Sequence, residues 1–373
     1  MNTGELREIL AHAGPFATVH LDGSHDTENA AHELELRWRA AREELAEKGA
    51  DEDTLSAMDN AVRDAPPATG RAGRLLIAAG GEVLLDRALA GPPPAPVTRV
   101  GACPYLLPLV ELDSGEVPYV AALVDKIGAD VRAVDADGVV RTEHSTDGED
   151  HPVHKVRGGG WSHLRMQHNV DETVHRNIRR VAEELARLVD EVGARLLVVA
   201  GERQVVAELA TELPPRCQEI LAEPAGRREN EGADFDRIVT SLAAERARSE
   251  QDRVVEEFRA ALAADRGLAV QGLAETAAAL RSGNAAAVVI SDPTLHDAAL
   301  WTSDEPRSVA LSEEELRAVG AEHVDRVRAD EALPAAALMV GADLVSAMDM
   351  GGDAVPVRDG IGVLLRHRPG ATG

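Results

Sequence analysis

The residues best suited to chemistry lie between Lys155 and Arg180, where basic side chains surround three consecutive glycines. Residues 151–180 hold six lysine and arginine residues against two acidic ones, whereas the whole chain has a formal net charge of −26. A local change of sign of this kind indicates a binding site for a polyanion. Because glycine lacks a Cβ atom, the backbone at Gly158, Gly159 and Gly160 is able to approach a ligand closely.

A helix is predicted directly after the glycine segment. Asn169 and Glu172 have the spacing of an N-cap residue and its capping-box partner. Arg176, Arg179 and Arg180 fall in the first turns of this helix, where we expect them to contact phosphate groups. They lie outside a stripe of apolar residues that recur at helical spacing, namely Val174, Ile178, Val181, Leu185, Leu188 and Val192.

Two segments resemble the peptide chain release factors of archaea and eukaryotes. The run from Gly159 to Arg165, Gly-Gly-Trp-Ser-His-Leu-Arg, is similar to the family pattern Gly-Gly-Gln-Ser-x-x-Arg, and the helix that follows is similar to the family helix without a gap. Near the other end, the run from Gly360 to Arg366 resembles the Gly-Ile-Gly-x-Ile-Leu-Arg strand of the family's C-terminal domain. The resemblance implies a bacterial homologue of the release factor and Pelota family, similar to Balon-like ribosome hibernation factors.

Trp161 stands where the family has the glutamine that positions water for hydrolysis of peptidyl-tRNA. Its indole donates one hydrogen bond and accepts none. The resemblance therefore implies a noncatalytic ribosome-binding translation factor that occupies the A site and inhibits or protects idle ribosomes, as in a stress response. The alternative is an enzyme, a peptidyl-tRNA hydrolase acting in ribosome rescue, in which Gln167 or His163 orients the water or acts as a base.

The predicted RNA-binding residues are the basic side chains of this region together with the glycine loop. For Trp161, stacking on an RNA base and packing against its own domain remain alternatives. The expected partners are ribosomal RNA at the A site and peptidyl-transferase centre, and elongation factor Tu or another translational GTPase. The complete set is Lys155, Arg157, Gly158, Gly159, Gly160, Trp161, Ser162, His163, Arg165, Arg176, Arg179 and Arg180.

Other chemistry has weaker sequence signals. The glycine run lacks the surrounding residues of a nucleotide-binding fingerprint, so no nucleotide cofactor is expected. Neighbouring histidines invite a metal site, but their spacing matches no zinc motif, and we expect neither a metal nor a cofactor. These histidines are His151, His154, His163, His168 and His175.

Composition favours a soluble protein of a reducing compartment. Cys103 and Cys217 are too few and too far apart for a disulfide framework. The N-terminus lacks a signal-peptide pattern, and no run of ~18 apolar residues is present, so we expect a cytoplasmic protein without membrane contact. The net charge of −26 argues against general affinity for nucleic acid, DNA included, and restricts RNA binding to a local surface.

Length and element pattern predict three α/β domains, since 373 residues exceed the ~150 typical of one domain. We place them at residues 1–97, an N-terminal α/β domain; 98–228, a central release-factor-like α/β sandwich carrying the glycine loop; and 229–373. The resemblance implies a ribosomal-protein-type α/β/α fold for the last.

Several local expectations accompany this division. Trp38 is expected in the core rather than at an RNA surface, and residues 92–96 are expected to form a proline-rich linker. Gly80 and Gly81 are expected to close a hairpin. In the C-terminal domain we expect Ser312 to cap a helix, and strands near Ala337 and Ile361.

Overall fold

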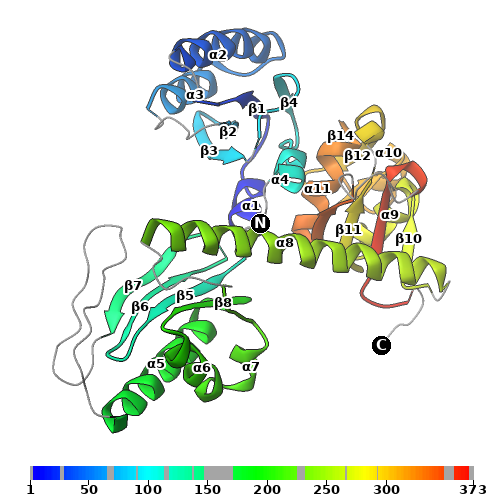
Figure 1. Cartoon of the computed structure of the whole chain (residues 1–373). Helices are drawn as coiled ribbons and strands as arrows, with labels where there is room; N and C mark the ends of the chain where they lie inside the picture. The colour runs from blue at the N-terminus through cyan, green and yellow to red at the C-terminus, as the bar shows by residue number, and fades with distance from the viewer. Residues whose placement is uncertain are drawn as a thin grey trace. The chain divides into compact units, whose positions relative to one another are not determined.

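The structure is a computed structural model that describes residues 3–25, 29–64, 71–89, 91–112, 117–136, 138–146, 171–224, 232–264, 267–291, 293–347 and 357–368. Its helices and strands form mixed sheets, which confirms the predicted α/β class (Figure 1). Two compact units are present. We call Gly115–Ser249 the central unit, and Thr3–Ser114 together with Glu250–Gly373 the terminal unit.

The N-terminal segment of the terminal unit contains an antiparallel sheet of four strands in the order β3-β2-β1-β4. Its strands are β1 (Phe16–Asp22), β2 (Gly73–Ala79), β3 (Glu82–Leu89) and β4 (Val97–Gly101). Gly80 and Gly81 join β2 to β3 with φ angles of 58° and 80°, which confirms the predicted hairpin turn. The helices of this segment are α1 (Thr3–Leu10), α2 (Ala30–Glu47), α3 (Glu52–Asp64) and α4 (Leu107–Leu112).

Helices α2 and α3 pack their apolar residues against this sheet. Trp38 is 6% exposed and lies in that core, as predicted, and its Nε1 donates a hydrogen bond to Asp59 Oδ1 at 2.7 Å. The proline-rich residues 92–96 lead into β4, which pairs with β1. They therefore return the chain to the same sheet instead of linking it to the next one.

The C-terminal segment of the terminal unit has two further sheets, in the orders β10-β16-β11-β15 and β13-β12-β14. Gly362 in β16 lies against Phe258 of α8, since a Cβ atom there would stand 2.3 Å from Phe258 Cζ. The elements after α8 (Gly232–Ala263) are β10 (Ala269–Gln271), α9 (Leu273–Arg281), β11 (Ala285–Ile290), η1 (Pro293–Asp297), β12 (Ala299–Ser303), β13 (Val309–Ala310), α10 (Glu313–Ala318), β14 (Val324–Arg328), α11 (Ala329–Met339), β15 (Asp343–Ser346), η2 (Arg358–Gly360) and β16 (Ile361–Leu365).

The predictions for this segment met different outcomes. Ser312 caps α10 by accepting a hydrogen bond from the backbone nitrogen of Glu315 at 3.3 Å, and Ile361 begins a strand, so both predictions are confirmed. The strand predicted near Ala337 is wrong, because Ala337 lies in helix α11. Residues 329–338 are all buried, so the sequence has no amphipathic period that separates a buried helix from a buried strand.

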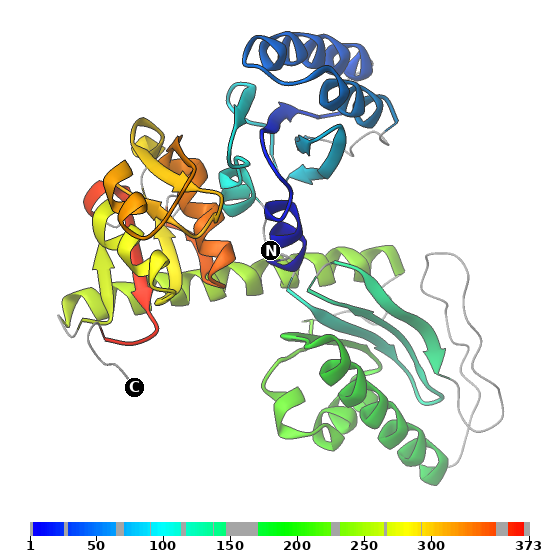
Figure 2. The same cartoon turned by 180° about the vertical axis from the view of Figure 1, so that it is seen from behind.

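The central unit is a five-stranded sheet, in the order β7-β6-β5-β8-β9, with helices on both faces. In Figures 1 and 2, α5 and α6 lie on one side of this sheet. Alternate residues of β5 and β8 contact these helices, and the residues between them contact Phe235 and Val239 of α8. Its elements are β5 (Tyr119–Val124), β6 (Ala129–Val134), β7 (Val140–Thr146), α5 (Asp171–Val192), β8 (Leu196–Gly201), α6 (Arg203–Glu212), α7 (Pro215–Gln218), β9 (Leu221–Ala222) and the first part of α8.

Candidate nucleic-acid interface

Helix α5 is fixed to the central unit by the apolar stripe that its sequence predicts. Ile178, Leu185 and Leu188 are at most 2% exposed and pack on β5, β6, β8 and α6. Burial of each leucine stabilises the fold by roughly 1.5–3 kcal/mol relative to its exposure to water. The position of the polar face of α5 is therefore set by the core beneath it.

Three of the arginines predicted to contact RNA belong to this exposed face of α5. Arg176, Arg179 and Arg180 are exposed, whereas Asn177 and Ile178 between them are buried. The sequence thus predicted the direction of these side chains correctly. Their contact with RNA stays a prediction.

Acidic residues of α6 lie beside part of this basic face. Arg179 Nε lies 3.3 Å from Glu212 Oε2, and these side chains are 70% and 36% exposed. His175 contacts Glu208 in the same way, one turn earlier on both helices. Exposed ion pairs of this kind contribute about 0–1 kcal/mol, so a phosphate group is able to displace the carboxylate.

The second half of α5 has a mixed charge. Arg187 Nη2 donates to Glu184 Oε1 at 2.8 Å, and this hydrogen bond is the main reason why the pKa of Glu184 lies below its usual value. Arg187 also contacts Glu191. A predominantly basic surface on α5 is therefore confined to its first turns.

The chain reaches and leaves residues 147–170 at one end of the sheet, where the β5–β6 turn lies. Thr146, the last residue of β7, pairs with Ala129 at the start of β6. On the other side, Asn177 Nδ2 donates to the carbonyl oxygen of Lys126 at 3.3 Å, which ties the second turn of α5 to the β5–β6 turn. The basic turns of α5 and the end of β7 consequently both lie by the β5–β6 turn.

Charged and polar contacts hold this end of the sheet together. Asp125 Oδ1 accepts hydrogen bonds from the backbone nitrogens of Ile127 at 2.7 Å and Gly128 at 3.0 Å, which closes the β5–β6 turn. Lys126 Nζ lies 3.1 Å from Glu202 Oε1, at the point where β8 ends and α6 begins. These contacts fix the turn to which Asn177 is bound.

Most of the predicted site lies outside the described residues. This applies to the glycine loop, to its basic neighbours and to both candidates for hydrolysis. The residues concerned are Lys155, Arg157, Gly158, Gly159, Gly160, Trp161, Ser162, His163, Arg165 and Gln167, together with the capping residue Asn169.

Three residues of this interface were not predicted from the sequence. Glu208 and Glu212 are four apart on α6, which indicates a shared helix face but not that α5 lies beside it. Asn177 stands at a position that continues the buried side of α5, and a polar residue there is a recognisable signal for a specific buried hydrogen bond.

The described residues contain no group of three His, Cys, Asp or Glu side chains arranged to hold a metal ion. Of the five histidines considered above, His175 alone falls within this part of the chain, and it contacts Glu208.

Among the helices of the described segments, none is long and apolar enough to cross a membrane.

Comparison with known proteins gives both sequence and structural relatives. The sequence profile of bacterial archaeo-eukaryotic release factor family 2 matches residues 118–264. Two uncharacterized proteins of Mycobacterium tuberculosis, MT2704 of strain CDC 1551 / Oshkosh and Rv2629 of strain ATCC 25618 / H37Rv, are each 38% identical over 98% of this chain and 97% of their own length.

Among solved structures, similarity is found with archaeal translation termination factor aRF1 at a TM-score of 0.26 and 16% identity, over 98% of this chain and 99% of that one. Ribosome-bound archaeal Pelota matches at a TM-score of 0.41 and 12% identity, over 98% and 94%. These structural likenesses are too distant to carry an argument about function.

The α/β sandwich of the central unit, with its basic helix after the segment 147–170, is thus that of a bacterial homologue of release factors. The chain belongs to bacterial archaeo-eukaryotic release factor family 2.

Proposed function

We propose that this protein binds the ribosome, occupies the A site without chemistry and thereby inhibits or protects idle ribosomes. The observation that carries the proposal is the exposed basic start of α5 in a chain of release-factor ancestry. This basic start lies at the end of the sheet from which the chain enters and leaves residues 147–170. A local basic surface is what an otherwise acidic protein needs to bind the phosphates of RNA.

The proposed division of labour follows the predicted domains. Residues 1–97 face the small subunit, the glycine loop of residues 98–228 reaches the peptidyl-transferase centre, and residues 229–373 contact elongation factor Tu or another translational GTPase. The substitution of Trp161 for the family glutamine supports the noncatalytic function, since an indole does not accept a hydrogen bond from water.

The test is cosedimentation of purified protein with bacterial ribosomes over a series of salt concentrations. The triple variant Arg176→Gln, Arg179→Gln, Arg180→Gln removes three positive charges. If all three contact phosphates, we expect the slope of log affinity against log salt to fall by about 2–3 and affinity to fall at least tenfold.

The matched control is Arg246→Gln, Arg248→Gln, Arg253→Gln, which removes three charges from exposed positions of α8. Equal loss in both triple variants would reduce the effect to net charge and remove the α5 surface from the proposal. A-site occupancy predicts in addition that the wild-type protein competes with aminoacyl-tRNA.

The same ribosomes, loaded with peptidyl-tRNA, distinguish the alternative. A noncatalytic factor binds without releasing peptide. Release by the wild-type protein that is lost in Gln167→Ala or His163→Ala, with binding retained, would instead establish the rescue hydrolase.

A further inference from the structure

A buried acidic pair begins helix α11 in the terminal unit, far in sequence from the α5 surface. Asp330 is 1% exposed and Glu331 is 5% exposed. Arg328 binds Asp330 through two hydrogen bonds, from Nε at 3.0 Å and from Nη2 at 2.9 Å. Asp330 is therefore fully matched by one guanidinium group.

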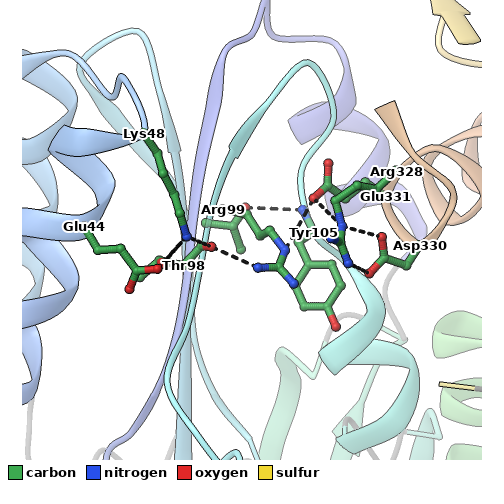
Figure 3. A network of polar contacts seen from close by, with 9 residues as sticks. Glu44, Lys48, Thr98, Arg99, Tyr105, Arg328, Asp330 and Glu331 are labelled. Atoms are coloured by element: carbon green, nitrogen blue, oxygen red, sulfur yellow. Dashed lines mark hydrogen bonds and ion pairs between the residues drawn. The ribbon is translucent and has the colours of Figure 1, made fainter. Parts of the chain in front are cut away.

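Glu331 is held more loosely, between two elements of the terminal unit. Its Oε1 lies 3.6 Å from the Nε of Arg99 on β4 and 3.6 Å from the Nε of Arg328, and both distances exceed that of a hydrogen bond. Within the described residues, the buried Nε of Arg99 has no hydrogen-bond partner. Figure 3 shows these residues from close by, with the guanidinium group of Arg99 between Thr98 of β4 and Glu331 at the start of α11.

The contact continues from Arg99 into α2. Arg99 donates to the carbonyl oxygen of Thr98 at 3.2 Å, and its guanidinium lies 5.4 Å from the centre of the Tyr105 ring. Thr98 Oγ1 accepts a hydrogen bond from Lys48 at 2.8 Å, and Lys48 pairs with Glu44 at 2.6 Å (Figure 3). These contacts connect Glu331 to β4 and, through Thr98 and Lys48, to Glu44 of α2.

The titratable groups that interact with Glu331 come from β4, β14, α11 and the segment after β4. Arg99 belongs to β4, Arg328 ends β14, Asp330 precedes Glu331 in α11, and the thiol of Cys103 follows β4. The pKa of Glu331 is raised to about 7, mainly by burial and also by the charge of Asp330, whereas Arg328 and Arg99 act in the opposite direction. The two arginines at 3.6 Å do not compensate for the loss of water.

We propose that Glu331 makes the contact between β4 and the start of α11 sensitive to protons, so that the contact is tight when the carboxyl group is neutral and loosens when it ionises. Opening exposes Glu331 to water, where the pKa of a carboxyl group returns to about 4.3. A group whose pKa is higher in the closed form favours closure below both values, and this preference is lost as pH rises through the higher one. The contact therefore weakens between about pH 4.5 and 7 and changes little above that.

Cys103 provides a direct probe of the opening. It is 6% exposed and lines the same cleft of about 1060 Å³ as Arg99 and Glu331. In the full chain with Cys217→Ala, Cys103 is the only thiol, because the sequence has two cysteines. At each pH, the ratio of its alkylation rate in urea to that in the native protein gives a protection factor. The pH dependence of alkylation that comes from ionisation of an exposed thiol cancels in this ratio.

We expect this protection factor to fall up to about tenfold per pH unit between pH 5 and 7 and to level off above. In Glu331→Gln it should stay high and constant. Burial is the main reason why the pKa of the Cys103 thiol is raised, and the charge of Glu331 adds to it. Ionisation of Glu331 therefore slows alkylation through this direct effect, and faster labelling does not arise from it. A flat wild-type profile, or an unchanged slope in Glu331→Gln, would overturn the proposal.

A second variant decides the matter if Glu331→Gln fails to fold. Arg99→Gln removes a charge that lowers the pKa of Glu331, so the pH at which the profile levels off should rise. Arg42→Gln is the matched control, since Arg42 pairs with Asp59 and Glu52 instead. If the profile levels off at the same pH in Arg99→Gln as in Arg42→Gln, Glu331 is not the titrating group.

Discussion

Arginine and glutamate meet at the start of α5 and at the start of α11, but with opposite consequences. Arg179 and Glu212 are 70% and 36% exposed, so water solvates both charges whether or not they pair. The side chain of Glu331 is 6% exposed beside Arg99, so its charge depends on its protein neighbours. The first arrangement suits exchange with a phosphate group, and the second suits a response to protons.

The exposed arrangement at the start of α5 depends on the apolar core that holds this helix on the sheet. Leu185→Ala removes a fully buried side chain of α5, in the core that holds this helix on the sheet. We expect a loss of about 2–5 kcal/mol in the free energy of unfolding of the central unit, because a cavity remains. Urea unfolding measures it, with Arg187→Ala on the exposed side of the same helix as a control that changes stability by less than about 1 kcal/mol. Equal effects would mean that α5 is not packed as described.

Glu331 should contribute measurably to how the stability of the terminal unit depends on pH. Since the pKa of Glu331 is raised to about 7, the folded protein favours the protonated form, and this contribution is lost as pH rises from about 4.5 to 7. At pH 8, the free energy of unfolding of Glu331→Gln should therefore exceed that of the wild type by on the order of 2 kcal/mol, with a smaller difference at pH 5. Urea unfolding at the two pH values measures it. A difference that is equal at both pH values would show that packing, and not ionisation, is responsible.

The sequence predicted these two regions unequally. The apolar period of α5 is strong, so its buried side and the exposure of Arg176, Arg179 and Arg180 were predictable. Strand β7, Val-Arg-Thr-Glu-His-Ser-Thr, was missed because an edge strand of polar residues lacks a hydrophobic alternation. Glu331 follows Arg-Ala-Asp and has the pattern of an exposed helix start. Its burial results from packing against β4, which is distant in the sequence and has no local signal.

The counter-charges on α6 also escaped prediction, and they provide the finest test of the exposed arrangement. If Glu212 competes with phosphate for Arg179, then Glu212→Gln should raise affinity for ribosomes at low salt. An exposed pair is worth about 0.2–1 kcal/mol, which corresponds to a gain of up to about fivefold. Glu191→Gln, which removes a partner of Arg187 at the far end of α5, is the control and should leave affinity nearly unchanged. If Glu212→Gln binds no better than Glu191→Gln, Arg179 does not exchange its carboxylate for a phosphate, and the basic surface narrows to Arg176 and Arg180.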